Sequence, residues 1–551
     1  MRKFESLINT TCIMRKKLLS LGIFACAFSV MHAQTRYVDE IFTDGDIVKM
    51  SDQIYGLNWQ EFAPAAIGGP QLLPNFMDVY MPSPAVDTET NRPVIVYFHT
   101  GSFLPKGLAG PVGEKTDSAA VEICKRFAKR GFVAISASYR VGWLANATDL
   151  DQRRGTNLLA VYKATQDARA LVRYLRRTVD QFGNPLGVNQ ERIILMGQGS
   201  GGYITFAAST LDKYQEVAGF DKFQYEEPSN TGLFGKPVAA GDPYIDTAIA
   251  GDWWGFGGQV CFTGDSTALG LPRVDTSCDG RNFVNHPGYS SDFAMAINLG
   301  GALGDESWLE KGDPVMVSVH VIQDFFAPFV EGMVRVPIGQ QFFNVVEVAG
   351  SYNAIKKASN LGNLNVLDFD WNDPLSLAAR NPAFNPFGIH HILPFDIPPP
   401  NPAAPFLVNS NPWDWWDPAD PAGANETNPN NVAQSKAYID TIFDFVIPRI
   451  KRVLDVANLS SDFEDAPMSV DRSVALFPNP TNDVLNIEVK GIHNSIRNVE
   501  VMDITGKRIQ LISGSNSSTA KVSLGHLANG AYLVRIQTNA GTLTQKLNIA
   551  H

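Results

Sequence analysis

A glycine-rich hexapeptide, Gly197 to Gly202, is the part of the sequence best placed to do chemistry. It follows the apolar run Ile193 to Met196 and has the spacing of a strand-to-helix turn that exposes a serine, Gly-x-Ser-x-Gly. With the outer glycines in register, Gly199 stands where the serine is expected, and Ser200 comes one place later. Glycine adopts the strained backbone of such a turn at little cost, so Gly199 would keep the turn and lose the attacking group.

Ser200 has two interpretations, and we favour the first. It lies in the first turn of the following helix, where its hydroxyl satisfies a free N–H. Alternatively, Ser200 is the nucleophile, which moves Gln198 to a glycine position where the chain packs tightly and a long side chain should clash.

A serine nucleophile also needs a histidine that takes its proton and an acid that orients the histidine. Asp324 is the candidate acid, because it follows a late apolar strand predicted over Val315 to Val321. His390 and His391 are the candidate bases, although they lie in a Pro-rich segment and not directly after a predicted strand. The catalytic candidates are therefore Ser200, Asp324, and His390 or His391.

A loop that could stabilise an oxyanion follows the strand predicted over Val94 to Phe98. Thr100, Gly101 and Ser102 offer backbone N–H donors there, and Gly201 offers another after the glycine-rich turn. Thr100 fits only if its backbone does not need a positive φ.

Strands and helices alternate through the middle of the chain. Apolar runs predict strands, and amphipathic spacing predicts helices between them. This order predicts a doubly wound, mostly parallel α/β sheet. The predicted strands are Val94–Phe98, Phe132–Ser138, Ile193–Met196, Ala294–Leu299, Val315–Val321 and Asn365–Phe369, and the helices are Ser118–Lys129, Thr165–Phe182 and Ala354–Leu361.

Several motifs occur in the order found in carboxylesterase and acetyl-esterase-like α/β hydrolases, which the chain resembles over most of residues 75 to 370. The resemblance implies the α/β-hydrolase fold and places Asp324 at the position of the family's orienting carboxylate. The motifs are Met77–Pro82, His99–Phe103, Tyr139–Arg140, Gln166–Leu171, Arg192–Gly202, Pro314–His320 and Asp324–Pro328.

The N-terminal region has the order of a secretory signal peptide. Basic residues 15 to 17 precede an apolar run from Leu18 to Val30, and a small residue, Ala33, suits cleavage. We predict a signal peptide over residues 1–33, with translation starting at Met14, and no transmembrane segment in the mature chain.

The C-terminal region is predicted to be a small all-β sandwich, because short alternating strands are separated by Gly and Asn turns. Residues 473–551 resemble the C-terminal sorting domain of type IX secretion, through Leu476–Pro480, Asp503–Lys507 and Leu527–Ile536. The resemblance implies the type IX machinery as a partner, and a secreted or cell-surface location.

Composition limits the other function classes. The formal net charge of −11 disfavours nucleic acid, whose phosphates require a basic surface. Cys261 and Cys278 are the plausible disulfide of an exported protein, while Cys124 lies in an amphipathic helix as a buried thiol. The cysteine spacing predicts no metal site, and no cofactor is expected.

Two tryptophan-rich segments exceed a minimal hydrolase core: one holds Trp253 and Trp254, and the other holds Trp413, Trp415 and Trp416. Their rings could line a ligand cleft, or they could close a core that long loops leave open, which is the favoured role for most of them. Residues 381–431 are expected to form an ordered cover over the domain.

We predict a hydrolase-like domain over residues 34–456, a linker over 457–472 and the sorting domain over 473–551. The favoured hypothesis is an exported α/β-hydrolase-fold protein that binds a small molecule or an ester without conventional serine-esterase chemistry. The alternative is an active carboxylic-ester hydrolase that uses Ser200, Asp324 and His390 or His391. A third hypothesis, a structural surface module, predicts no pocket at the carboxyl ends of the strands.

Overall fold

The central sheet has eight strands in the order β1-β2-β4-β3-β5-β8-β10-β13. Their bounds are β1 Ile47–Gln60, β2 Gln71–Pro82, β3 Arg92–Phe98, β4 Val133–Ala137, β5 Val188–Gln198, β8 Met295–Leu299, β10 Val315–Val321 and β13 Ile392–Phe395. The computed structural model describes residues 36–550 except 64–68, 109, 268–269, 339–340, 370, 384, 399–408, 418–430, 463–473, 490–495, 504–507, 514–518 and 539–540.

Strands β4, β3, β5, β8, β10 and β13 run parallel to one another, and β2 is antiparallel to both of its neighbours, β1 and β4. All seven residues of β3 and all five of β8 are buried. Continuous apolar runs are typical of strands covered on both faces. The prediction of a doubly wound, mostly parallel sheet is confirmed.

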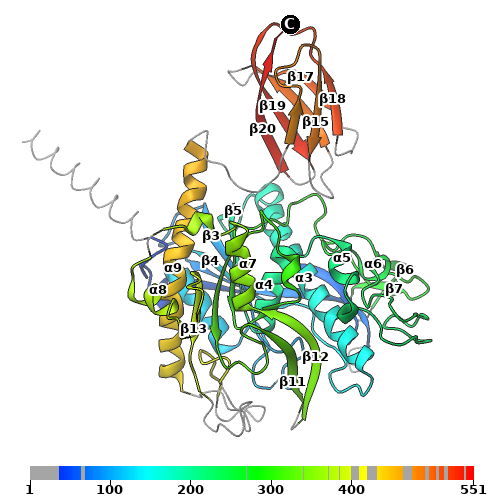
Figure 1. Cartoon of the computed structure of the whole chain (residues 1–551), viewed down its shortest axis with the longest axis vertical. Helices are drawn as coiled ribbons and strands as arrows, with labels where there is room; N and C mark the ends of the chain where they lie inside the picture. The colour runs from blue at the N-terminus through cyan, green and yellow to red at the C-terminus, as the bar shows by residue number, and fades with distance from the viewer. Residues whose placement is uncertain are drawn as a thin grey trace, which may run out of the picture.

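Helices cover both faces of this sheet (Figure 1). Helices α3 (Leu150–Gln181), α4 (Ser200–Thr210) and α7 (Ser351–Asn360) pack in one core cluster. Helices α2 (Ser118–Lys129) and α9 (Val432–Asp462) pack in the cluster on the other face. The sheet therefore holds the turns at its carboxyl edge between two rigid layers.

One predicted strand is wrong. Residues 365–369 do not enter the sheet, because Asn365–Leu367 form a 3-10 turn in which Leu367 is fully buried. A short apolar run does not by itself distinguish a strand from a turn anchored in the core. The last strand of the sheet is β13, which lies inside the segment predicted as a cover.

Shorter elements surround the sheet. A hairpin of β6 and β7 carries the predicted disulfide between Cys261 and Cys278, which is confirmed, and Cys124 is a buried free thiol. The remaining elements are η1 Asp44–Asp46, α5 Tyr214–Ala218, η3 Asp221–Phe223, α6 Thr247–Ala250, β6 Cys261–Ser266, β7 Pro272–Asp275, β9 Ala302–Leu303, η4 Glu306–Trp308, β11 Glu331–Ile338, β12 Gln341–Gly350, η5 Asn365–Leu367 and α8 Pro374–Ala379.

The C-terminal region forms two antiparallel sheets, β14-β15-β18 and β17-β16-β19-β20. Alternate apolar residues of both sheets, including Leu485, Val499 and Val534, form one core cluster. The predicted all-β sandwich is confirmed. The strands are β14 Val474–Phe477, β15 Val484–Val489, β16 Ile496–Met502, β17 Arg508–Ser513, β18 Thr519–Ser523, β19 Gly530–Thr538 and β20 Gly541–Ile549.

The predicted signal peptide lies outside the described residues. Helix α9 continues to Asp462, so the first residues of the predicted linker are helical. The rest of the linker lies outside the described residues. Within the described part of the chain, no helix has the length and apolarity needed to cross a membrane.

Candidate functional site

The turn between β5 and α4 is built from glycines. Gly199 has φ 51° and ψ −115°, a backbone conformation that strains residues with a Cβ, and its N–H donates to the Leu299 carbonyl at 2.8 Å. A Cβ at Gly197 would lie 2.0 Å from the Gly201 carbonyl oxygen, and one at Gly201 would lie 2.1 Å from that of Phe98. Only glycine fits these two flanking positions.

The Thr100 side chain fills the space beside Gly199. A Cβ built on Gly199 would lie 2.3 Å from Thr100 Oγ1 and 3.2 Å from Thr100 Cβ. Real Cβ atoms do not approach an oxygen that closely. A serine at position 199 would therefore require Thr100 to move.

Ser200 is the first residue of α4 and is 4% exposed. Its Oγ lies 2.8 Å from the Tyr139 hydroxyl, which also donates to the His99 carbonyl at 2.9 Å. A phenol has one proton to donate. When Tyr139 donates it to the His99 carbonyl, the Ser200 hydroxyl donates its own proton to the Tyr139 oxygen. The partner of Ser200 is thus a buried tyrosine and not a histidine.

The loop after β3 has an unusual backbone. The φ values in this loop are positive at Gly101 (124°), Ser102 (52°) and Phe103 (56°). The φ of Thr100 is not positive, as its side chain requires. The Trp143 indole N–H donates to the Ser102 carbonyl at 2.8 Å. This bond ties the loop after β3 to the loop after β4.

His99 precedes this loop and is buried. Its Nδ1 lies 2.6 Å from the Thr100 carbonyl oxygen, and its ring stacks on Tyr139 with centroids 4.5 Å apart. Burial lowers the pKa of His99 from 6.5 to about 4, against the opposing effect of the bond to Thr100. The neutral ring therefore serves to pack and orient the loop.

Asp324 follows β10 and accepts three hydrogen bonds on Oδ1. The donors are the Ser410 hydroxyl at 2.9 Å and the backbone N–H groups of Phe326 at 2.8 Å and Ala327 at 3.0 Å. Its Oδ2 lies 3.4 Å from His320 Nε2. The carboxylate thus organises its own loop and holds Ser410.

His320 and Ser351 form a second buried cluster beside Asp324. His320 Nδ1 lies 2.6 Å from Ser351 Oγ, and His320 Nε2 lies 2.9 Å from the Ala327 carbonyl oxygen. Asn298 donates to Ser351 Oγ at 2.8 Å, and both His320 and Ser351 are fully buried. The spacing of His320 and Asp324, four residues apart, was the available sequence signal for this contact. Nothing in the sequence indicated Ser351 or Ser410.

His390 and His391 stand before β13, which runs parallel to β10. They therefore lie at the amino edge of the sheet, whereas Ser200 and Asp324 lie at the carboxyl edge. His391 Nδ1 accepts from Arg449 Nε at 3.2 Å, and His390 contacts Arg380 at 3.2 Å. Burial, and then Arg449, lowers the pKa of His391 to about 3. The structure does not bring either histidine to Ser200 or Asp324.

The five tryptophans of the two tryptophan-rich segments pack against other residues. Trp413 is fully buried, and Trp253 and Trp416 are each 7% exposed. The Arg169 guanidinium lies 4.2 Å from the Trp254 ring centroid, and Lys436 lies 5.9 Å from that of Trp415. These contacts match the core-closing role that the sequence favoured for most of them.

A cavity of about 510 Å³ lies beside the loop after β4. Its wall begins at Leu144, next to Trp143, and includes the aromatic side chains of Phe62 and Tyr225. Carboxyl-bearing residues complete much of its lining: Glu61, Asp149, Asp151, Glu226 and Glu227. None of the five tryptophans is among the described lining residues.

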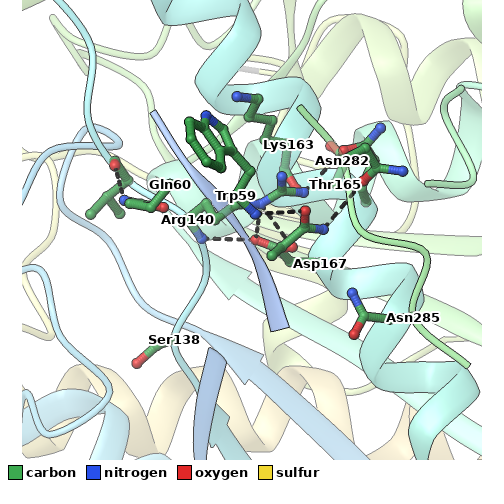
Figure 2. A network of polar contacts seen from close by, with 12 residues as sticks. Trp59, Gln60, Ser138, Arg140, Lys163, Thr165, Asp167, Asn282 and Asn285 are labelled. Carbon is green, nitrogen blue, oxygen red and sulfur yellow. Dashed lines mark hydrogen bonds and ion pairs between the residues drawn. The ribbon is translucent and has the colours of Figure 1, made fainter. Parts of the chain in front are cut away.

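An ion pair between Arg140 and Asp167 fixes the loop after β4 (Figure 2). Arg140 Nε donates to Asp167 Oδ1 at 3.0 Å, and the Arg140 backbone N–H donates to Oδ2 at 2.9 Å. Arg140 Nη2 donates to the Lys163 carbonyl at 2.8 Å, and Lys163 pairs with Glu61 at 2.9 Å. Helix α3 thus positions the loop after β4.

Among the described residues, no group of three or more His, Cys, Asp or Glu side chains is arranged to hold a metal ion.

Comparison with solved structures finds similarity to esterase 2 of Thermogutta terrifontis, at a TM-score of 0.25 in each case. The form phosphorylated by paraoxon is 16% identical over 51% of this chain and 73% of that chain. The apo form is 16% identical over 50% and 74%, and the native form is 15% identical over 50% and 72%. The comparison with curated proteins gives no match.

Two family models match the sequence. Residues 77–233, which run from β2 through the glycine-rich turn, match BD-FAE. Residues 475–550, which form the C-terminal sandwich, match the secretion system C-terminal sorting domain. The chain therefore combines an α/β-hydrolase-like domain, which matches BD-FAE over residues 77–233, with a sorting domain for type IX secretion to the cell surface or extracellular space.

Proposed function

We propose that this exported α/β-hydrolase-fold protein binds a ligand and does not perform serine-dependent ester hydrolysis. The observation that carries the proposal is the 2.3 Å approach of Thr100 Oγ1 to a Cβ built on Gly199. Gly199 stands at the position of the nucleophilic serine, and the Thr100 side chain occupies the space that a serine hydroxymethyl group would need.

The surroundings of Ser200 support the same proposal. Proton transfer from a serine requires a base within about 2.6–3.2 Å. The group at that distance is the Tyr139 hydroxyl, and burial raises the pKa of this phenol. A neutral phenol does not take up the proton of a serine hydroxyl, so no described residue is placed to act as a base for Ser200.

The cavity of about 510 Å³ is where we expect the ligand. Its volume lies within the range of about 300–1,000 Å³ that is usual for small-molecule sites. It follows the carboxyl end of β4, on the edge of the sheet where ligands of open α/β folds bind. Its carboxylates disfavour an anionic ligand.

Labelling of the full chain with a fluorophosphonate probe tests the loss of catalysis. We expect no labelling of the wild-type protein or of Ser200→Ala, with a known serine esterase as the positive control. Wild-type labelling that disappears in Ser200→Ala would establish the alternative, an active hydrolase using Ser200. Labelling that persists in Ser200→Ala would identify another reactive serine and would also overturn the proposal.

Thermal shift with a panel of neutral and cationic small molecules tests the binding site. Leu144 is 39% exposed at the cavity wall, so Leu144→Trp should reduce the cavity without disturbing the core. We expect stabilising compounds to lose their effect in Leu144→Trp and to keep it in Leu108→Trp, a control at another exposed leucine. Equal shifts in both variants would place binding elsewhere.

A further inference from the structure

Residues 410–417, here called the strap, lie across the carboxyl ends of three neighbouring strands. Ser410 Oγ donates to Asp324 after β10, and the Asn411 amide oxygen lies 3.7 Å from a Cβ built on Gly300 after β8. Gln198 Nε2, at the end of β5, donates to Asp414 Oδ2. The strap thus covers the edge of the sheet that carries the glycine-rich turn.

Asp414 follows the fully buried Trp413 and is the most deeply buried polar side chain of the strap, with 1% exposure. Its side-chain partner is the neutral Gln198 amide, whose orientation is fixed because Tyr97 donates to Gln198 Oε1 at 2.6 Å. The Gln198 amide must therefore present its N–H group to Asp414. A neutral carboxylic acid fits this environment, whereas a carboxylate would be a buried charge with an amide as its partner.

Among the described residues, the charged groups around Asp414 do not compensate a negative charge. From the N-terminus of α2, Asp117 adds a second acidic group, whose Oδ1 lies 3.8 Å from Lys106. From α9, Ser435 binds the Asp414 backbone carbonyl, and Lys436 lies over Trp415. Burial, and then the charge of Asp117, raises the pKa of Asp414 well above its usual value, and burial raises that of Asp117 to about 6.

We propose that the strap is a pH-dependent latch, in which a neutral Asp414 carboxyl holds residues 410–417 against the end of β5 and loss of its proton releases them. The direction of this pH dependence follows from proton linkage. The closed strap binds the Asp414 proton more tightly than the open strap does, so closure is most favourable in acid and weakens as the pH rises. The latch goes beyond the proposed function and does not depend on it.

Hydrogen exchange of the full chain, followed by mass spectrometry of the strap peptide, tests the latch. Protection factors, which remove the intrinsic pH dependence of exchange, are compared at about pH 5.5 and about pH 8.5. We expect the wild-type protection factor to fall at least about tenfold over this range, because opening releases the Asp414 proton. The sandwich peptides of residues 530–538 serve as the internal reference.

Asp414→Asn keeps an oxygen acceptor for Gln198 and cannot ionise, so its strap should stay protected at both pH values. Asp417→Asn, at the exposed end of the strap, is the matched control and should behave as the wild type does. The latch is wrong if wild-type protection does not change with pH, which needs no variant to fold. It is also wrong if the two variants respond alike.

Discussion

The carboxyl ends of β5 and β10 differ in what they keep of a hydrolase site. At the end of β5, glycines keep the backbone turn, and Thr100 lies where a side chain on Gly199 would stand. At the end of β10, Asp324 keeps its side chain, and its partners are Ser410 and backbone N–H groups. At the end of β5 the close packing of glycines accounts for the turn, and at the end of β10 hydrogen bonds account for the orientation of Asp324.

The sharpest test of the β5 end is Gly201→Ala. Its Cβ would lie 2.1 Å from the Phe98 carbonyl oxygen, so we expect a loss of about 3 kcal/mol or more in the free energy of unfolding. Gly235→Ala, at φ 74° with open space around it, controls for backbone strain alone and should cost about 1 kcal/mol. Denaturant unfolding measures both. Equal costs would mean that packing does not fix the turn.

The folded protein should also lose stability in acid through His99, which follows β3. The folded pKa of His99 is lowered, so its stabilising contribution is complete above pH 6.5 and is lost as the pH falls towards 4. The loss over that interval is about 3 kcal/mol. His99→Gln keeps an N–H donor and should show a flatter stability curve between these pH values. An unchanged curve would contradict a buried neutral histidine.

At the β10 end, Asp324→Ala should cost about 2 kcal/mol, because it leaves two backbone N–H groups and the Ser410 hydroxyl without their acceptor. Ser410→Ala removes one of these bonds and should cost about 1 kcal/mol. Thermal unfolding of the two variants gives the comparison. A larger cost for Ser410→Ala would mean that the strap, and not the Asp324 loop, depends on this contact.

The sequence predicted the backbone of the β5 end because glycine spacing reports directly on a local turn. It also predicted the position of Asp324, since a strand of apolar residues ends just before it. The partners of these residues come from distant segments: Ser410 is 86 positions from Asp324, and Asp414 is 216 from Gln198. Their pairing depends on the path of the chain through β13, which a Pro-rich sequence does not reveal. For the same reason the sequence offered His390 and His391 as candidate bases, whereas the structure places them at the amino edge of the sheet.

The contact between Thr100 and position 199 can be measured directly by a double-mutant cycle. Gly199→Ser alone should destabilise the protein by about 2 kcal/mol through overpacking and a strained backbone. Thr100→Ala removes the clashing Oγ1, so it should restore about 1 kcal/mol in combination with Gly199→Ser, whereas Thr100→Val keeps an atom there and should not. Additive effects with Thr100→Ala would contradict the claim that Thr100 fills the nucleophile's space.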